Sequence, residues 1–188
     1  MIIKAFNDYQ PKNEQEAQDQ KLILSFLKTH DDALERSNLF GHVTSSAFIL
    51  NQSMDRIIFA YHKIYDSWAW VGGHADGNPD LLEVAIKEAK EETGLKAVTP
   101  FSKDIFTIDV IYVKNHIKYG HYVPDHLHLN ATYLLIADDT QPLFHQEAEH
   151  LDVRWFDLDD VLNHVSETRM IPIYQKALDW IRQIKRQS

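Results

Sequence analysis

The spacing of hydrophobic residues changes near residue 40 of this chain. Between residues 13 and 30 the apolar side chains recur at intervals of three and four, as on one face of a helix: Leu22, Ile23, Phe26 and Leu27. A second short helix is predicted over residues 31–37. Beyond residue 40 the pattern of residues becomes typical of strands. Residues 1–40 are therefore predicted to form an N-terminal helical extension.

The segments that follow are rich in β-branched and aromatic residues. Residues 42–51 and 56–62 are separated by four mostly polar residues, Gln52-Ser53-Met54-Asp55, which predicts a hairpin. A short strand over residues 68–71 runs into Gly72-Gly73. Further strands are expected over residues 105–114, 127–137 and 152–156.

One helix carries clear start and stop signals. Asn78 is a good N-cap and Pro79 suits a first helical turn, although Asp80 and Glu83 could instead form a capping box slightly later. Gly94 supplies the left-handed residue that ends a helix. We therefore predict a helix over residues 79–93.

Two more helices are expected near the end of the chain, over residues 159–165 and 171–184. Strands with interspersed helices and no regular alternation predict an α/β fold, in which a mixed sheet carries helices on both faces. Residues 41–188 are expected to form this one domain, including its C-terminal helix.

Composition narrows the classes of function. The 188 residues include no cysteine, which excludes disulfides and thiolate chemistry, and the formal charge of −9 disfavours binding to nucleic-acid backbones. No apolar run approaches the ~18 residues of a membrane helix. The first twenty residues turn polar too early for a secretory signal. These features predict a soluble, cytoplasmic protein.

Three glutamates crowd one patch of the predicted helix. Glu88, Glu91 and Glu92 lie at positions i, i+3 and i+4, where like charges cost roughly 0.2–0.5 kcal/mol per pair. They also occupy the last turn, where the helix dipole disfavours negative charge. The plain alternative is a solvated acidic face compensated by Lys87 and Lys90. Hard divalent cations such as Mg²⁺ prefer carboxylate oxygens, so a metal site is the functional interpretation.

The segment from Gly73 to Leu95 resembles the Nudix box, GX5EX7REUXEEXGU with U an apolar residue. The spacing matches without a gap, and the late glutamates stand in place. Pro79 replaces the box's first glutamate and Lys87 its arginine, so a contact of Lys87 with Asp80 or Glu83 could substitute for that pair. The resemblance extends over roughly residues 40–165.

The resemblance implies a Nudix-type α/β/α sandwich and hydrolysis of a nucleoside diphosphate linked to another group, with Mg²⁺ or Mn²⁺ as cofactor. It implies that Glu88 and Glu92 ligate metal and that Glu91 ligates metal or acts as general base. The carbonyl of Gly72 or Gly73 is a further candidate ligand. A glutamate of a later loop is the other candidate base; Glu149 lies in such a segment, which could also be a plain polar loop.

Histidines and aromatic residues supply candidate substrate contacts. His74 follows the glycine pair and would lie by the phosphates. His126 and His128 alternate on a predicted strand and face one side; they could contact substrate, serve structure, or ligate zinc, although no third ligand is evident in sequence. His42 is interpreted as a strand-end residue.

Tyr65 and Trp70 are the aromatic candidates for stacking on a base or sugar. Packing in the core is the equal alternative for Trp70 and its neighbour Trp68.

Other classes fit less well. A Nudix-like sensor that binds a nucleotide-derived metabolite without hydrolysis is the main alternative, although such a module normally lacks a box glutamate. An isopentenyl diphosphate isomerase of this fold would rely on a cysteine that the chain does not have, and a coincidental box in a generic interaction domain is the weakest alternative. We expect a small phosphorylated partner, no nucleic acid and no membrane, with the terminal elements as a candidate homodimer contact.

Overall fold

The computed structural model describes residues 2–118 and 120–187. Met1, Tyr119 and Ser188 lie outside the described residues. The first position of the predicted extension, residues 1–40, and the last position of the predicted domain, residues 41–188, are therefore not described. The chain divides into two compact units. The first unit holds residues 1–46, 72–85 and 102–133, and the second holds residues 47–71, 86–101 and 134–188. In the part of the chain that the structure describes, no helix is long and apolar enough to cross a membrane.

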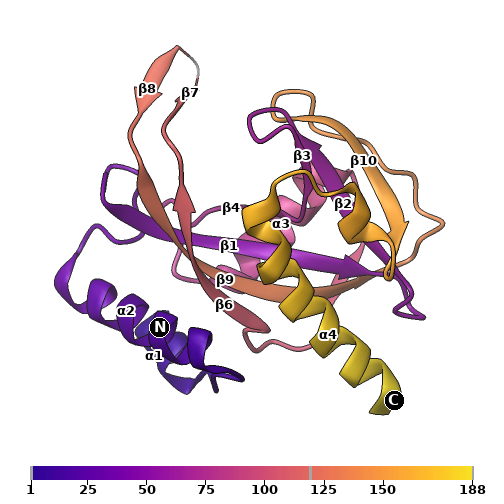
Figure 1. Ribbon diagram of the computed structural model, residues 1–188, viewed down its shortest axis with the longest axis horizontal. Coiled ribbons are helices and arrows are strands. Elements are labelled where there is room, and N and C mark those ends of the chain that lie inside the picture. The colour runs from indigo at the N-terminus through magenta and orange to yellow at the C-terminus, as the bar shows by residue number, and fades with distance from the viewer. Residues whose placement is uncertain (1, 119, 188) are drawn as a thin grey trace. The chain divides into compact units, whose positions relative to one another are not determined.

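Eight strands pair into one sheet in the order β10-β2-β1-β9-β5, with β3 on β2, β4 on β1 and β6 on β9 (Figure 1). Their bounds are β1 Gly41–Leu50, β2 Arg56–His62, β3 Ser67–Ala69, β4 Val71–His74, β5 Val98–Pro100, β6 Thr107–Val113, β9 His126–Ala137 and β10 His150–Asp157. Most pairs are antiparallel, whereas β1 and β9 run in the same direction (Figure 1). The sheet is therefore mixed, as predicted.

The helices are α1 Ile2–Asp8, α2 Glu14–Thr29, α3 Leu81–Thr93 and α4 Ile171–Gln187. Short 3₁₀ turns, η1 Val161–His164 and η2 Thr168–Met170, precede α4. The remaining strands, β7 His116–Lys118 and β8 His121–Val123, form a separate hairpin between β6 and β9. The α/β fold with N-terminal and C-terminal helices agrees with the prediction.

Two predicted helices are corrected. Residues 31–37 form successive turns, in which Ala33 and Glu35 each donate a backbone hydrogen bond to the carbonyl three residues earlier. The Asn38 side chain donates to Asp32 and accepts from the Phe40 N–H, and such side-chain bonds compete with a helical ladder. The helix predicted over residues 159–165 is only the 3₁₀ turn η1. The short elements α1, β5, β7 and β8 were not predicted, because their few residues show no periodicity.

A buried carboxylate anchors the first unit. Glu16 of α2 is fully buried and accepts hydrogen bonds from the Tyr9 hydroxyl at 2.7 Å and the Lys12 N–H at 3.0 Å. Its other oxygen lies 3.4 Å from the N–H of Ile108 on β6. Burial and the Glu16 carboxylate raise the pKa of Tyr9. Glu16 therefore ties α2 to the edge of β6, where it supplies an acceptor for a strand N–H.

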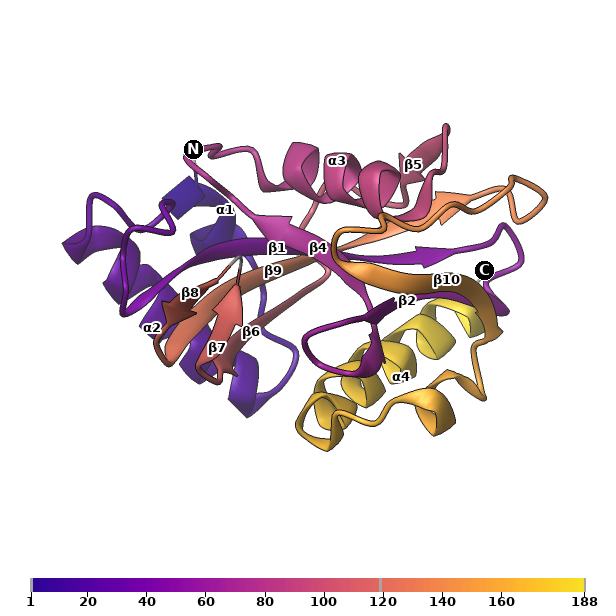
Figure 2. The ribbon, with the colours of Figure 1, turned by 90° about the horizontal axis from the view of Figure 1, so that it is seen from above.

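Aromatic rings form the centre of the second unit. The fully buried Phe48 and Phe59 lie on β1 and β2, and their ring centroids are 6.1 and 5.1 Å from that of Tyr174 on α4. The edge-to-face geometry is the favoured arrangement for such rings. This contact holds α4 beside β2 (Figure 2).

Candidate active site

The helix that carries the three glutamates begins at Leu81, two residues later than Pro79. Asp80 is its cap, because one Asp80 oxygen accepts the N–H of Glu83 at 3.0 Å. Asn78 has a different role. Its side-chain Oδ1 accepts the N–H of Asp80 at 2.9 Å, and its side-chain Nδ2 donates to Glu83 at 3.1 Å. Asp80 is thus the cap, but only half of the predicted capping box forms, because the Asp80 N–H donates to the Asn78 side chain and not to Glu83.

Gly94 ends the helix as predicted. Its φ is +71°, and its N–H donates to the Lys90 carbonyl at 2.9 Å. A Cβ added here would lie 2.9 Å from the Cβ of Phe144, so the following loop also packs closely against this position. Both the backbone conformation and the contact require glycine.

The three glutamates differ strongly in exposure. Glu91 has 48% of its side chain exposed, Glu88 has 18% and Glu92 has 3%. Burial raises the pKa of Glu88, Lys87 lowers it, and the negative charges of Glu91 and Glu149 raise it further. Glu88 is therefore a half-buried carboxylate in a field of other carboxylates, which a bound cation would relieve.

Lys87 lies among these carboxylates. Its Nζ is 3.4 Å from an oxygen of Glu88 and 3.4 Å from an oxygen of Glu91, and Glu88 is the main cause of its raised pKa. The anticipated contact with Asp80 or Glu83 is replaced by these two, since an (i, i+4) partner lies within reach on the same face. Lys87 is mostly exposed and supplies partial neutralisation.

Glu92 has a partner from a distant part of the chain. Its Oε2 lies 3.5 Å from Nε2 of His150, the first residue of β10, and both side chains are buried. Burial lowers the pKa of His150 to about 4, so the imidazole that meets Glu92 is neutral near pH 7. Helical angle alone does not reveal this interior position.

Glu149 lies just before β10, and its backbone is fixed at two points. Its N–H donates to the Gln146 carbonyl at 3.1 Å, and its carbonyl accepts the N–H of Lys63 at 3.0 Å. Its charge raises the pKa values of Glu88 and of Tyr65. The loop glutamate and the helix glutamates therefore share one electrostatic environment within the second unit.

The two aromatic candidates have different surroundings. Tyr65 stacks on His62, with ring centroids 4.3 Å apart, and burial is the main cause of its raised pKa. Trp70 packs edge to face against Phe48 at 5.3 Å and Tyr174 at 5.2 Å. Trp70 thus joins the aromatic centre of the second unit, and a part in substrate binding stays a prediction for both.

The glycine pair belongs to the first unit. A Cβ on Gly72 would lie 2.6 Å from the carbonyl oxygen of Ser45, so β4 approaches β1 more closely than a side chain would allow. Gly73 and His74 follow on the same strand and are half-buried. A metal contact by the Gly73 carbonyl stays a prediction.

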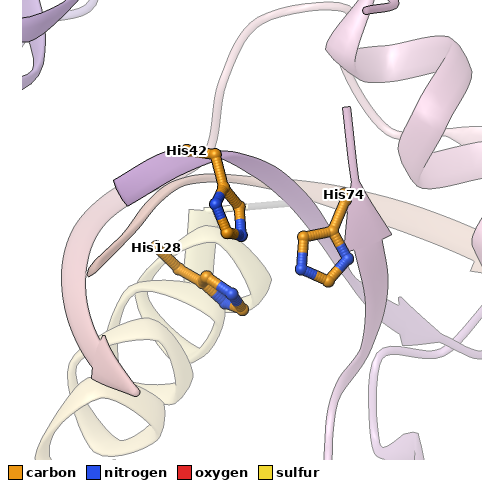
Figure 3. Close-up of side chains that lie close together, drawn as sticks. All are labelled: His42, His74 and His128. Carbon is orange, nitrogen blue, oxygen red and sulfur yellow. The ribbon is translucent and has the colours of Figure 1, made fainter. Parts of the chain in front are cut away.

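Three histidines converge in the first unit (Figure 3). His42 on β1, His74 on β4 and His128 on β9 each offer a ring nitrogen, and the three nitrogens lie within 4.8 Å of one another. Sequence reasoning took up His74 and His128 and set His42 aside. The missed signal is that all three positions lie on strands that become neighbours, which appears only when strand order is known.

Comparison with known proteins identifies the family. The model of the NUDIX domain matches residues 41–181. No curated protein matches the chain. Among solved structures the chain is similar to an Ap4A hydrolase from C. elegans, with 16% identity, 75% of this chain and 98% of that chain covered, and a TM-score of 0.55.

Two further structures are similar in fold. The E. coli dihydroneopterin triphosphate pyrophosphohydrolase has 14% identity, covers 71% of this chain and 92% of its own, and gives a TM-score of 0.53. A hydrolase of the NUDIX family from Clostridium perfringens has 22% identity, covers 74% and 97%, and gives 0.51. At these identities the likeness extends to the fold.

The fold and the glutamate-bearing helix define a Nudix-type hydrolase domain. The chain belongs to the Nudix family, which confirms the resemblance of residues 73–95 and the expected class of enzyme, a hydrolase acting on diphosphate linkages.

Proposed function

We propose that this protein hydrolyses a nucleoside diphosphate linked to another moiety, with Mg²⁺ or Mn²⁺ as cofactor. The observation that carries the proposal is Glu88: a half-buried carboxylate whose pKa is raised by burial and by two further carboxylates. Such an arrangement is unfavourable in the protein alone and favourable around a hard divalent cation.

The residues present fit such a cation. Glu88 and Glu91 lie within the reach of a single lysine ammonium, so their oxygens already converge on one positive centre. Glu92 is positioned by His150, whose Nε2 lies 3.5 Å from its Oε2. We propose Glu88, Glu91 and Glu92 as ligands, with the carbonyl of Gly73 as a further one. When bound, the metal would neutralise phosphate charge and lower the pKa of an attacking water.

The proton of the attacking water needs an acceptor. Glu91 and Glu149 are the two candidates, and both influence the pKa of Glu88, which supports proximity to the same centre. Glu91 is the more exposed of the helix glutamates, and Glu149 is fixed through its backbone to Lys63. Either carboxylate could take the proton within hydrogen-bond reach of the water.

Substrate recognition is proposed for Tyr65, Trp70, His74 and His128. The strongest support is for Tyr65, whose ring stacks on His62 and whose pKa is raised by the charge of Glu149. A base or sugar at this point would extend the stack. We further propose a small phosphorylated partner without nucleic acid or membrane, a cytoplasmic location, and a homodimer as candidate assembly.

The test is a substrate panel. Purified protein is incubated with nucleoside triphosphates, dinucleoside polyphosphates, ADP-ribose and sugar nucleotides, with Mg²⁺ or Mn²⁺, and phosphate is measured after coupling to pyrophosphatase or phosphatase. We expect turnover of at least one substrate, lost in Glu92→Gln. Full activity of Glu92→Gln would refute the metal assignment. Tight binding of one compound without turnover would favour the sensor alternative.

The choice of base has its own control. Glu149→Gln and Glu147→Gln change two positions of one loop, and the charge of Glu149 raises the pKa of Glu88. If Glu149 is the base, its variant loses about 10²–10⁴-fold in kcat, the usual contribution of a general base, while Glu147→Gln keeps wild-type kcat. Equal kcat in both loop variants, with loss in Glu91→Gln, assigns the base to the helix.

A further inference from the structure

The histidine cluster of the first unit lies on three neighbouring strands and is not used by the glutamate chemistry. The ring centroids of His42, His74 and His128 are 4.9, 5.1 and 5.0 Å apart pairwise, so the rings stand at the corners of a nearly equilateral triangle (Figure 3). His42 is buried, and the other two are half-buried. Three imidazoles from separate strands therefore face one common point.

His42 directs a lone pair into this cluster. Its Nδ1 lies 3.3 Å from the carbonyl oxygen of Asn38, which can only accept, so Nδ1 carries the proton. Its Nε2 is consequently an acceptor, and this buried atom has no hydrogen-bond partner among the described residues. A buried imidazole nitrogen without a partner is costly unless something binds it.

His128 is oriented by a second histidine. Nδ1 of His126 lies 2.8 Å from the carbonyl oxygen of Pro124 and therefore donates, which leaves Nε2 of His126 as an acceptor. That atom is 3.2 Å from Nε2 of His128, so His128 donates through Nε2 and keeps a lone pair on Nδ1. A ligand histidine whose other nitrogen donates to a fixed acceptor is the usual outer-shell arrangement of metal sites.

The charge state of the cluster favours a cation over an anion. Burial lowers the pKa of His42 and lowers that of His128 well below its ordinary value, and the neighbouring histidines lower the pKa of His128 further. The rings of His42 and His128 are then neutral near pH 7, with lone pairs available. An anion would require imidazolium groups packed against each other, which their mutual repulsion disfavours.

We propose that His42, His74 and His128 form a binding site for a divalent transition-metal ion of the zinc type, separate in its ligands from the glutamate site. Imidazole nitrogen suits Zn²⁺ and its neighbours, whereas Mg²⁺ prefers oxygen. Zn–N bonds of about 2.0–2.1 Å bring tetrahedral ligand nitrogens to about 3.3 Å from one another. The nitrogens here lie within 4.8 Å, so side-chain rotation suffices to close the site.

Three protein ligands leave one position of a tetrahedral metal for water or another oxygen. A phosphate oxygen could fill that position, so a metal at this site would also bring His74 and His128 into contact with a phosphorylated ligand. Of the His-x-His pair only His128 is a ligand here, with His126 as its hydrogen-bond partner. The other two ligands come from neighbouring strands: His42 from the strand beside β9, and His74 from the strand beside β1.

The test measures metal binding alone, on full-length protein stripped with chelator. The Glu88→Gln/Glu91→Gln double variant removes the main competing carboxylates, and Zn²⁺ is titrated by calorimetry while Co²⁺ is followed by its visible absorption. We expect one equivalent per chain and the intense absorption of four-coordinate Co²⁺. His42→Gln, His74→Gln and His128→Gln should each weaken Zn²⁺ binding at least tenfold, whereas His121→Gln, on the exposed strand β8, should not.

Circular dichroism and the melting temperature establish that each variant is folded. A second measurement needs no substitution: in the ¹H–¹⁵N spectrum of the imidazole rings, one equivalent of Zn²⁺ should shift three histidines and leave the exposed His121 and His164 unchanged. Zn²⁺ affinity unaffected by all three substitutions, or Zn²⁺ shifts confined to histidines outside the cluster, would overturn the proposal.

Discussion

Glu92 and His150 are buried against each other, with 3.5 Å between Oε2 and Nε2. Glu92 lies in the last turn of α3, and His150 begins β10. The contact therefore joins the glutamate-bearing helix to a strand that comes much later in the sequence. A carboxylate in this position has little freedom to move. We interpret His150 as a positioning residue for Glu92.

The first prediction concerns pH. The folded-state pKa of His150 is about 4, against 6.5 for an exposed histidine. Between these values the unfolded chain binds a proton that the folded chain does not, so the contribution is intact above pH 6.5 and is lost as pH falls to 4. The loss amounts to roughly 3 kcal/mol at about 1.4 kcal/mol per unit.

Urea unfolding at several pH values between 7.5 and 4, with chelator present, measures this loss. We expect the free energy of unfolding to fall less steeply with pH in His150→Gln than in the wild type. His164→Gln, which changes an exposed histidine, should keep the wild-type slope. Identical slopes for His150→Gln and the wild type would contradict the buried, neutral state of His150.

The second prediction is that one substitution at Glu88 raises stability and abolishes activity. A raised pKa means that the charged carboxylate is less favourable in the folded chain, a cost that is present at neutral pH and disappears below the ordinary value near 4.5. Glu88→Gln should therefore raise the free energy of unfolding of the metal-free protein by roughly 0.5 kcal/mol, since like-charge pairs at helical spacing are relieved. Hydrolysis should be lost.

Glu83→Gln is the matched control for Glu88. Glu83 lies in the first turn of the same helix, where the dipole favours negative charge, so its neutralisation should slightly lower stability and leave hydrolysis intact. Chemical denaturation without Mg²⁺ measures the stability of both variants, and phosphate release from a panel substrate measures their hydrolysis. A loss of metal-free stability in Glu88→Gln would show that the carboxylate is not under repulsion.

The box helix was predictable because its signals are local. The spacing of its apolar residues, the pair Asp80 and Glu83, and Gly94 at its end are all contained in one stretch of sequence. The choice between Asn78 and Asp80 as cap was not, because both are good caps and Pro79 suits a first turn after either an early or a late start.

The site could be predicted only as far as it follows from the helix. Exposure of the glutamates depends on what packs against α3: Glu92 meets His150, a residue of another strand, and this contact has no signature in either segment. The histidine cluster likewise depends on strand order, since β1 lies between β4 and β9 in pairing, and not on spacing along the chain. Such features arise from tertiary structure.

The third prediction tests the start of the helix. Asp80→Ala removes the side chain that accepts the Glu83 N–H and should cost about 1 kcal/mol of unfolding free energy, whereas Asp80→Asn keeps an acceptor and should cost much less. Asn78→Ala, two residues earlier, should cost less than Asp80→Ala. The reverse order in thermal or urea unfolding would make Asn78 the cap.

The last prediction separates the two aromatic candidates. Trp70 packs against the buried rings of Phe48 and Tyr174, so Trp70→Ala should lower the free energy of unfolding by about 3 kcal/mol, near the lower end of the range for buried aromatic residues. Tyr65 stacks on His62, and the charge of Glu149 raises its pKa, so Tyr65→Ala should mainly weaken substrate binding. With a substrate from the panel, we expect its KM to rise about tenfold, within the energy of one base stack. Tyr65→Phe keeps the ring and should keep KM. If Trp70→Ala instead raised KM with unchanged stability, or if Tyr65→Ala lowered stability with unchanged KM, the two assignments would have to be exchanged.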